Sequence, residues 1–465
     1  MHTKDMGVAV RQSPLGKLKR FLLAGGLCFM GVFSHAQSKL PVQPSSPKPG
    51  PQTEVTVDAR QGKLGVGMPD PLFTGLDAAV AGLNFTDVLR RDLEDAGPFA
   101  LLKGNLPSSA AASTVKPWLD AGAEWVLALK VTKTGEAVTV ALQVLDVKAT
   151  AQGDGKQMRY AFSKNYTGNA TLLRRIAHTL ADDLVDRLTG DRGIANTRIV
   201  FVRQMAPGIK ELFQVDRDGA NPIELTRYGS LTLSPTVAPD GRLAYVTYKG
   251  GSPEIWGQKK PGGPHERLYP NGGTGIQGSC YAPVWSPDGK RLAFSQSDRR
   301  GNSDIVVLDV QSGRVRKLTD GGFINTSPSW NPAGTQIAFT SDREGGPQIY
   351  LMEEDGSNVR RLTVEGSYNE SPAWSPNGAM IAYVSRFEGK FDLFIFKLGE
   401  GKAYQITTGV ASSESPAWSP DERRLVFSSN RGGNMQIWTT DLSGNSVKRL
   451  TDFRNCQSAK WTRSR

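Results

Sequence analysis

Ser-Pro-Ala-Trp-Ser-Pro-Asn-Gly, at residues 371–378, is one of five copies of a phrase that recurs through the second half of the chain. The other copies begin at Ser234, Ala282, Ser327 and Ser415, and the prolines of the last four copies are 45, 44 and 44 residues apart. A fixed period of this size indicates a repeat architecture with one supersecondary unit per repeat. The phrase therefore predicts the fold of most of the chain.

Each unit predicts four short strands. After Ser327, segments rich in β-branched and aromatic residues alternate with Asn-Pro-Ala-Gly and Asp-Gly turn sequences. Proline presets φ, Asp caps the turn and Gly supplies a positive φ, so these sequences favour hairpins between the strands. Four antiparallel strands in a unit of this length are typical of a β-propeller blade.

The two ends of the array predict the number of blades. Ser458-Ala-Lys-Trp461 copies only the first strand of a unit, and Arg198 to Arg203 resembles a second strand with no first strand before it. We expect the C-terminal strand to complete the N-terminal blade, because closing the ring removes exposed sheet edges. One composite blade and five whole blades give an all-β, six-bladed propeller over residues 198–465.

The residues before the propeller divide into three parts. Residues 1–36 combine a basic flank, a short apolar run and a Ser-His-Ala end, which indicates a signal peptide, with an uncleaved anchor as the alternative. Residues 37–53 contain five prolines and predict an extended tether. Residues 54–192 have the mixed texture of a smaller α/β domain, followed by a junction at 193–197.

Within the α/β domain, hydrophobic periodicity predicts two helices, at 77–95 and 171–188. Alternating apolar residues predict strands at 63–68, 125–131 and 138–145, the last two joined as a hairpin. The residues expected to face inward are Ala79, Leu83, Val88, Leu89 and Leu93 in the first helix and Leu172, Leu173, Ile176, Leu180, Leu184 and Leu188 in the second.

Charge and cysteine content limit the class of protein. The formal net charge is +11, of which the leader contributes +4, and the remaining basic residues are scattered among acids. We therefore expect a solvated surface and no nucleic-acid partner. Beyond the leader the chain keeps Cys280 and Cys456, two blades apart, which favours isolated thiols over a disulfide.

Catalytic signatures are missing from the sequence. Beyond the leader only His178 and His265 remain, and no Gly-x-Ser-x-Gly elbow, Cys/His zinc spacing or phosphate-binding glycine loop occurs. A structural role is favoured for His178. We therefore expect a protein that is not an enzyme, with no catalytic residue and no cofactor.

Short Asp-Gly fragments raise the question of calcium. They occur at Asp216 to Gly219, Asp309 to Gly313, Asp355-Gly356 and Asp441 to Gly444. A calcium loop of the EF-hand kind is longer and ends in a bidentate Glu, so turn chemistry is favoured and no metal site is predicted. The sequence leaves open whether a cation occupies the central channel.

One face of the ring is the predicted binding face. In a four-stranded blade, the loop into the first strand and the loop after the second open on the same face, and rigid loops on a scaffold are where binding residues concentrate. The loops into the first strands carry Ser279, Cys280, Tyr281, Ala282, Asn325, Thr326, Asn369, Glu370, Ser413 and Glu414. The loops after the second strands carry Arg299, Arg343, Arg386 and Arg431, which would form a ring of donors for a partner or would fix the loops by local pairing.

The combination of parts resembles the TolB family, the periplasmic component of the Tol–Pal system. The resemblance rests on the leader, the α/β domain, six blades with Ser-Pro-x-Trp-Ser-Pro-Asp-Gly, and Ser-Asp-Arg-x-Gly-x-x-Gln-Ile-Tyr at 341–350. It implies a periplasmic scaffold that supports outer-membrane integrity and cell division.

The resemblance also implies partners. The lipoprotein Pal would bind the loops into the first strands, which would make the protein peripheral to the outer membrane, and further envelope proteins could join. The inner-membrane protein TolA would bind an N-terminal arm, which here corresponds to Glu54, Val55, Thr56, Val57 and Asp58. This arm follows a Pro-rich tether instead of the cleavage site, so it matches the family less closely. A sensor or carrier that binds a small ligand or oligosaccharide in the channel is the alternative function.

Overall fold

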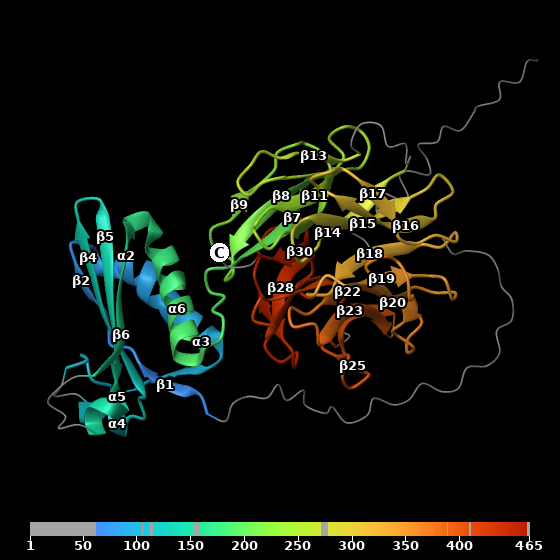
Figure 1. Cartoon of the computed structure of the whole chain (residues 1–465). Coiled ribbons are helices and arrows are strands. Elements are labelled where there is room, and N and C mark those ends of the chain that lie inside the picture. The colour runs from blue at the N-terminus through green and yellow to red at the C-terminus, as the bar shows by residue number, and fades with distance from the viewer. Residues whose placement is uncertain are drawn as a thin grey trace, which may run out of the picture.

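The computed structural model describes residues 62–104, 106–111, 115–152, 159–270, 278–387, 389–408 and 411–462. The expected leader, tether and N-terminal arm lie outside these residues. An α/β domain and a β-propeller lie side by side (Figure 1). Among the described helices, none has the length and apolar content needed to cross a membrane.

The propeller consists of six four-stranded antiparallel sheets. The first blade has the order β30–β7–β8–β9, so the C-terminal strand pairs with the N-terminal one as the sequence predicted. Its strands are β30 (Cys456–Trp461), β7 (Arg198–Ala206), β8 (Ile209–Asp216) and β9 (Ile223–Glu224). The expected fold class is confirmed.

The other five blades are each built from four consecutive strands. The strands of blade two are β10 (Thr232–Val237), β11 (Leu243–Thr247), β12 (Glu254–Gly257) and β13 (Glu266–Tyr269), and those of blade three are β14 (Cys280–Trp285), β15 (Arg291–Ser297), β16 (Ser303–Asp309) and β17 (Val315–Lys317). Blade four contains β18 (Asn325–Trp330), β19 (Gln336–Ser341), β20 (Gln348–Glu353) and β21 (Arg360–Arg361). Blade five contains β22 (Asn369–Trp374), β23 (Met380–Phe387), β24 (Lys390–Lys397) and β25 (Lys402–Gln405), and blade six contains β26 (Ser413–Trp418), β27 (Arg424–Ser429), β28 (Gln436–Asp441) and β29 (Lys448–Arg449).

Every first strand carries a β-bulge at the Ser-Pro part of the repeated phrase. The bulge residue has a left-handed φ close to +50° in all six blades, at Ser234, Ala282, Ser327, Ser371, Ser415 and Ser458. The register shift leaves this residue and the next one out of the ladder with the second strand. A bulge suits the proline that follows in five blades, because proline has no N–H to donate to a ladder.

An aromatic residue at one position of each second strand fills the propeller core. These rings are buried to 4% exposure or less, and they are Phe201, Tyr245, Phe294, Phe339, Tyr383 and Phe427. Each ring takes a large apolar area out of water, so this layer contributes several kcal/mol per blade to the stability of the ring.

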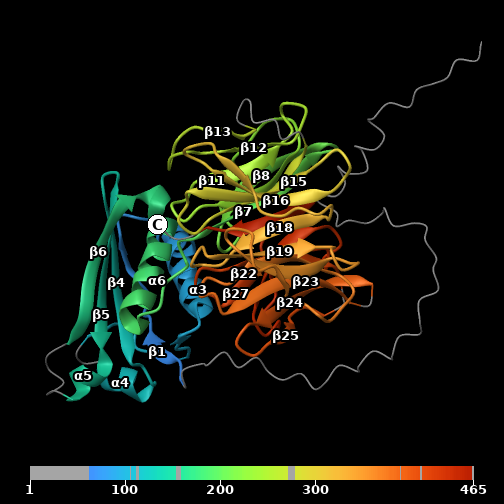
Figure 2. The ribbon, with the colours of Figure 1, turned by 45° about the vertical axis from the view of Figure 1, so that its right-hand side comes forward.

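The α/β domain is a sheet of order β3–β1–β4–β5–β6, with β2 paired to β4. Helices α3 and α6 cover the face of the sheet that is turned to the propeller (Figures 1 and 2). The strands are β1 (Leu64–Gly67), β2 (Leu72–Thr74), β3 (Phe99–Leu101), β4 (Trp125–Thr134), β5 (Ala137–Asp146) and β6 (Tyr160–Asn169). The helices are α2 (Ala78–Ala81), α3 (Asp87–Ala96), α4 (Val115–Asp120), α5 (Val147–Gln152) and α6 (Leu173–Thr189).

The first predicted helix is interrupted by a π-helical turn, η1 (Gly82–Thr86), between α2 and α3. The wider turn shifts the buried face, so Phe85 is fully buried while Leu83 is 67% exposed. The prediction that Leu83 and Ala79 face inward was therefore wrong. Leu172 is also exposed, because it ends a 3₁₀ turn, η3 (Ala170–Leu172), before α6.

The two domains meet where α3, α6 and the junction touch the turns of blades one and six. Arg423 donates to the carbonyl oxygen of Ala96 at 2.9 Å and pairs with Asp191 at 2.8 Å. Arg424 donates to the carbonyl oxygen of Asp95 at 2.6 Å. The face of the ring that carries the turns after the first and third strands, here named the turn face, is therefore the docking surface of the α/β domain.

Candidate functional site

The first strands of the six blades line a central cavity of about 280 Å³. The cavity opens on the face opposite the turn face, here named the mouth face. The second residues of the six first strands all line the cavity and form what we call the mouth ring: Leu233, Tyr281, Thr326, Glu370, Glu414 and Gln457. Tyr281, Thr326, Glu370 and Glu414 are half-buried and belong to the predicted contact residues.

Four other predicted contact residues lie inside the protein. Cys280, Asn325, Asn369 and Ser413 are the first residues of their strands rather than loop residues, and each is 1% exposed or less. Asn369 illustrates their role, because its Nδ2 donates to Gln348 Oε1 at 2.7 Å and to the carbonyl oxygen of Glu365 at 2.8 Å. These side chains fix the neighbouring loops, so their placement as exposed loop residues was wrong.

The remaining two predicted residues of this set flank Cys280 and Tyr281. Ser279 is half-buried, and its backbone N–H donates to Ser297 Oγ at 3.2 Å. Ala282 is the bulge residue of blade three and lines the cavity. Of the predicted contact residues in the first strands, Tyr281, Ala282, Thr326, Glu370 and Glu414 line the cavity, while the sequence did not separate them from the residues that face the blade interior.

The four predicted arginines do not form a ring. The strand registers place Arg343 and Arg431 two residues after the positions of Ser341 and Ser429, which are equivalent in their blades. In blade three the equivalent position is Asp298, because the strand carries one residue more before its Asp-Arg pair, and Arg386 lies one position too early in blade five. The arginines look equivalent in the sequence, but the strand registers place them at different positions of their blades.

Arg343 and Arg431 are held by their own blades. Arg343 Nε donates to Ser341 Oγ at 3.0 Å and Nη2 to Asn325 Oδ1 at 3.1 Å, while its guanidinium lies 4.9 Å from the ring centre of Tyr350. Arg431 lies over the Phe427 ring, and burial lowers its pKa from the usual value. This geometry favours the local role for both residues. Arg299 and Arg386 are exposed.

Lys460 is a lining residue that the sequence analysis missed. It occupies the fifth position of β30 and lines the cavity. The equivalent residues of the other blades are neutral, namely Thr236, Val284, Ser329, Ala373 and Ala417. Comparison of the six copies at this one position would have revealed the exception. Burial lowers the pKa of Lys460 below its usual value.

The opposite end of the channel opens at the turn face and is lined by tryptophans. A second cavity of about 210 Å³ lies there. Its wall includes the last residue of five first strands, Trp285, Trp330, Trp374, Trp418 and Trp461. The channel therefore has one aromatic end and one end that carries carboxylates.

Cys280 and Cys456, the two cysteines within the described residues, are free and buried. Burial raises the pKa of Cys280 to about 12 and that of Cys456 to about 11, because the thiolate loses hydration. Such thiols are unreactive at neutral pH. The expectation of two isolated thiols is confirmed.

The Asp-Gly fragments are turns, as predicted. Asp309 Oδ1 accepts the backbone N–H of Ser312 at 2.7 Å, and Asp355 Oδ1 accepts that of Ser357 at 2.9 Å. Gly313 and Gly356 have φ values of +72° and +92°. These contacts are the Asx-turn chemistry that the residue types favour.

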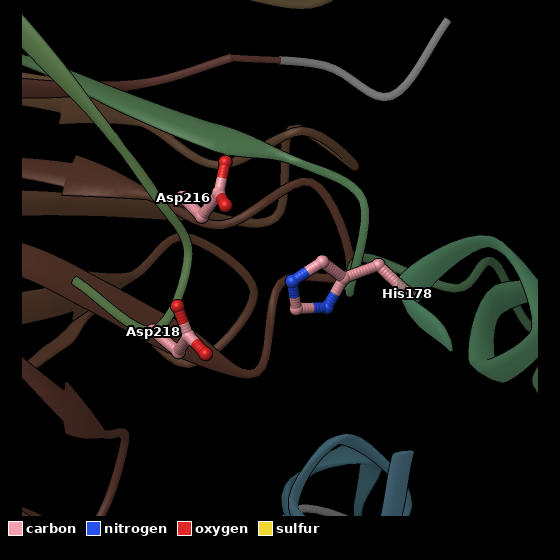
Figure 3. A group of neighbouring side chains, drawn as sticks. All are labelled: His178, Asp216 and Asp218. Carbon is pink, nitrogen blue, oxygen red and sulfur yellow. The ribbon is translucent and has the colours of Figure 1, made fainter. Parts of the chain in front are cut away.

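A polar cluster at the domain interface includes His178. The ring of His178 points from α6 toward Asp216 and Asp218 (Figure 3), and its Nδ1 lies 2.6 Å from Asp92 Oδ2. Although these carboxylates and the imidazole are close enough to suggest a metal site, Arg174 pairs with both Asp216 and Asp218. Arg198 also pairs with Asp216 and Arg91 with Asp218, so guanidinium groups already balance the two carboxylates, and the donor set fits an interdomain ion-pair network better than a cation.

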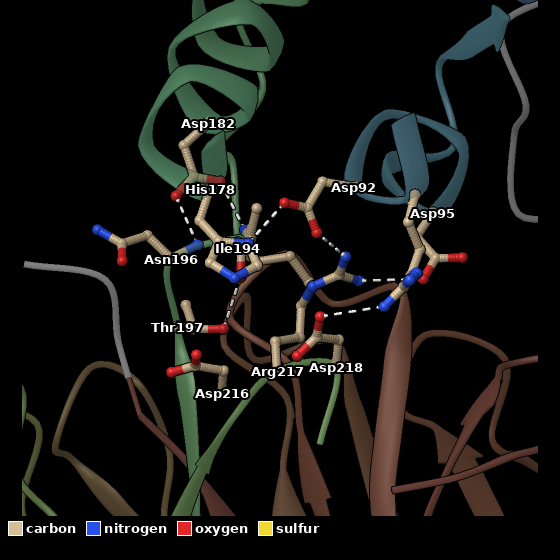
Figure 4. Close-up of polar contacts among 12 residues, drawn as sticks. Asp92, Asp95, His178, Asp182, Ile194, Asn196, Thr197, Asp216, Arg217 and Asp218 are labelled. Atoms are coloured by element: carbon tan, nitrogen blue, oxygen red, sulfur yellow. Dashed lines mark hydrogen bonds and ion pairs between the residues drawn. The ribbon is translucent and has the colours of Figure 1, made fainter. Parts of the chain in front are cut away.

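Asp92 is the centre of this cluster. It is 1% exposed and lies between His178 and Arg217, whose Nη2 donates to Asp92 Oδ1 at 3.0 Å (Figure 4). Nearby Asp182 accepts the backbone N–H groups of Ala195 and Asn196 in the junction, and burial raises its pKa to about 6. The structural role expected for His178 therefore consists of connecting α3 and α6 beside the propeller.

Comparisons with known proteins agree with this architecture. The family model for the TolB beta propeller domain matches residues 185–393 and 369–464. The Tol-Pal system protein TolB of Anaeromyxobacter dehalogenans (strain 2CP-C) is 36% identical over 263 residues, which cover 55% of this chain and 57% of the relative. The protein TolB homolog of Chlorobium chlorochromatii (strain CaD3) is 32% identical over 275 residues, which cover 58% of each chain.

A solved structure extends the likeness beyond the propeller. The crystal structure of TolB from Acinetobacter baumannii matches with a TM-score of 0.71 and 26% sequence identity, over 87% of this chain and 98% of that one. The curated relatives are matched over little more than half of their own length. The family model alone spans more than half of the chain, and the chain therefore belongs to the TolB beta-propeller family.

Proposed function

We propose that the chain is a non-catalytic periplasmic scaffold of the Tol–Pal system. In this proposal it binds the lipoprotein Pal on the mouth face of the propeller and TolA through its N-terminal arm. It thereby supports outer-membrane integrity during cell division.

The main support is the match to the TolB crystal structure, which covers the α/β domain as well as the propeller. The division of labour between the two faces adds to it. The turn face of blades one and six is occupied by the α/β domain, while the mouth ring offers half-buried Tyr281, Thr326, Glu370 and Glu414. Aromatic and charged side chains around a depression are common anchors at protein interfaces.

A pull-down with purified Pal from the same organism tests the assignment of the mouth face. We expect the double variant Glu370→Lys, Glu414→Lys to weaken capture at least about tenfold, because two charges reverse at the contact. The matched control is Asp355→Lys, Glu400→Lys, which reverses two exposed charges in turn-face loops of blades four and five. Equal capture by both double variants would place Pal elsewhere, and no capture by the unaltered protein would contradict the proposal.

A second pull-down tests the arm. Deletion of residues 37–58 should abolish capture of TolA and leave capture of Pal intact. Loss of both captures would contradict separate sites for the two partners.

Binding of a small molecule in the channel is a second candidate function, and the cavity of about 280 Å³ favours it. This function does not exclude the first, because the cavity lies behind the mouth ring. Native mass spectrometry of the purified protein would detect a retained ligand.

A further inference from the structure

The channel contains a lysine that has no direct partner in the part of the chain that the structure describes. Lys460 is the only cation among the described residues that line the cavity. Its ammonium has neither an ion pair nor a hydrogen bond to any residue that the structure describes. It is half-buried, and the accessible part of its side chain faces the cavity.

Such a residue is unfavourable unless something pairs with it. Even a half-buried charge loses part of its hydration, and without a partner it gains no interaction in return. Alanine fills the same position in blades five and six, at Ala373 and Ala417, so the fold itself does not require a lysine there. An anion bound in the cavity would supply the missing partner.

The lining limits the charge of that anion. Glu370 and Glu414 line the same cavity, so a doubly charged phosphate would add to an existing excess of negative charge. A single carboxylate balances Lys460 alone. The bulge residues Ser371, Ser415 and Ser458 also line the cavity and offer hydroxyl donors between the two levels.

The spacing limits the length of the ligand. Lys460 belongs to the fifth position of its strand, whereas Glu370 and Glu414 belong to the second position of theirs. The bulge takes the third and fourth residues out of the ladder, so these two levels are two ladder steps apart along the partner strand, which span about 7 Å. A ligand with its carboxylate at Lys460 and a positive charge near the two glutamates therefore has at least the length of a dipeptide.

We propose that the channel binds a zwitterionic chain of the short-peptide class, with its carboxylate on Lys460 and its ammonium at the mouth ring. This site extends from the channel interior to Glu370 and Glu414, which the proposed function also assigns to Pal, and it is tested on the protein without Pal, so failure of one proposal is distinguishable from failure of the other. The ligand is free or forms the C-terminal end of a longer polypeptide, and both present the same group to Lys460.

Saturation-transfer NMR with the full chain tests this proposal on three probes at millimolar concentration. Triglycine should give a signal, triglycinamide should give none because it lacks the carboxylate, and N-acetyltriglycine should bind more weakly because it lacks the ammonium. Equal signals from triglycine and triglycinamide, or no signal from triglycine, would overturn the proposal. A response to acetate equal to that of triglycine would overturn the zwitterionic ligand. A longer peptide with the same C-terminal residues that competes with triglycine would identify the polypeptide source, and its failure to compete would identify a free ligand.

Three variants connect the signal to the lysine. Lys460→Ala should weaken triglycine binding about tenfold or more, and Lys460→Arg should retain most of it because the charge remains. The control Lys402→Ala removes an equal charge from the outermost strand of blade five. A melting curve checks that Lys460→Ala is folded. Unchanged binding by the folded Lys460→Ala variant would refute the assignment.

Discussion

The two faces of the propeller use the same residue types for different purposes. On the turn face, Gly356 has a φ of +92°, and an added Cβ would lie 2.5 Å from the carbonyl oxygen of Leu318 in the preceding blade. On the mouth face of the same blade, Gly345 has a φ of +106°, and an added Cβ would meet nothing within 4 Å. At this pair of positions the turn-face loop is packed against the neighbouring blade, whereas the mouth-face loop is open.

Charged residues show the same difference. Arg217, in the turn after β8, is 5% exposed and reaches Asp92 of the α/β domain. The mouth ring keeps Glu370 and Glu414 half-buried at the edge of a cavity. The contrast indicates that changes on the turn face alter stability and domain docking, while changes on the mouth face alter binding.

The largest effect is expected for Arg217→Ala. The substitution leaves the buried Asp92 carboxylate without its guanidinium partner, which costs about 3–5 kcal/mol. We expect this loss of stability to lower the melting temperature of the Arg217→Ala variant and to speed its proteolysis at the junction 193–197. Arg90→Ala removes an exposed ion pair to Asp70 and should change stability by less than about 0.5 kcal/mol. Similar melting temperatures for the two variants would contradict the importance of the interdomain pair.

The matched glycines provide the next comparison. Gly356→Ala should cost about 2–4 kcal/mol, because a positive φ and a backbone clash act together. Gly345→Ala has the φ penalty alone and should cost about 1 kcal/mol. Urea unfolding followed by tryptophan fluorescence measures both. If the free energy of unfolding fell by the same amount in both variants, the closer packing around Gly356 would contribute nothing to stability.

The smallest effect is expected for the mouth-face arginines, and it tests whether they contact a partner or fix their own loops. Arg343→Ala removes two hydrogen bonds and an aromatic contact and should cost about 1–2 kcal/mol, while exposed Arg299→Ala should be nearly neutral. Thermal melting provides the values, and the Pal pull-down provides the second readout. A stable Arg343→Ala variant that no longer captures Pal would make this arginine a partner contact.

The sequence predicted the blades because their signals are local. Turn residues, a first-strand tryptophan and a second-strand aromatic such as Phe339 recur at one period, and the broken copies at both ends specify how the ring closes. The prediction of side-chain positions failed where one added residue in a helix or strand changes which way the following side chains face. The π-helical turn exposes Leu83, and one extra residue in blade three displaces Arg299.

Other features escaped for lack of a pattern. Strand β6 has mostly exposed or half-buried side chains, so it lacks the apolar alternation that marks a strand. Side-chain direction also cannot be read at the start of a strand, and Asn369 and Glu370 illustrate this, because one is buried and the next lines the cavity. The sequence contains Lys460 in plain view, but nothing marks it as unusual on its own. It stands out only when the fifth residues of all six first strands are aligned and the other five are seen to be neutral.

The composite first blade has a consequence for the order of folding. Arg198 and Thr462 are hydrogen-bonded across 264 residues. Strand β7 therefore cannot pair with β30 until nearly the whole propeller has been synthesised. Closing a loop of that length costs about 5 kcal/mol of chain entropy, which the five whole blades reduce when they fold first and bring the ends together. We therefore expect ring closure to be the last and slowest step of folding, and β7 to be the strand that is most exposed to mispairing in a nascent chain.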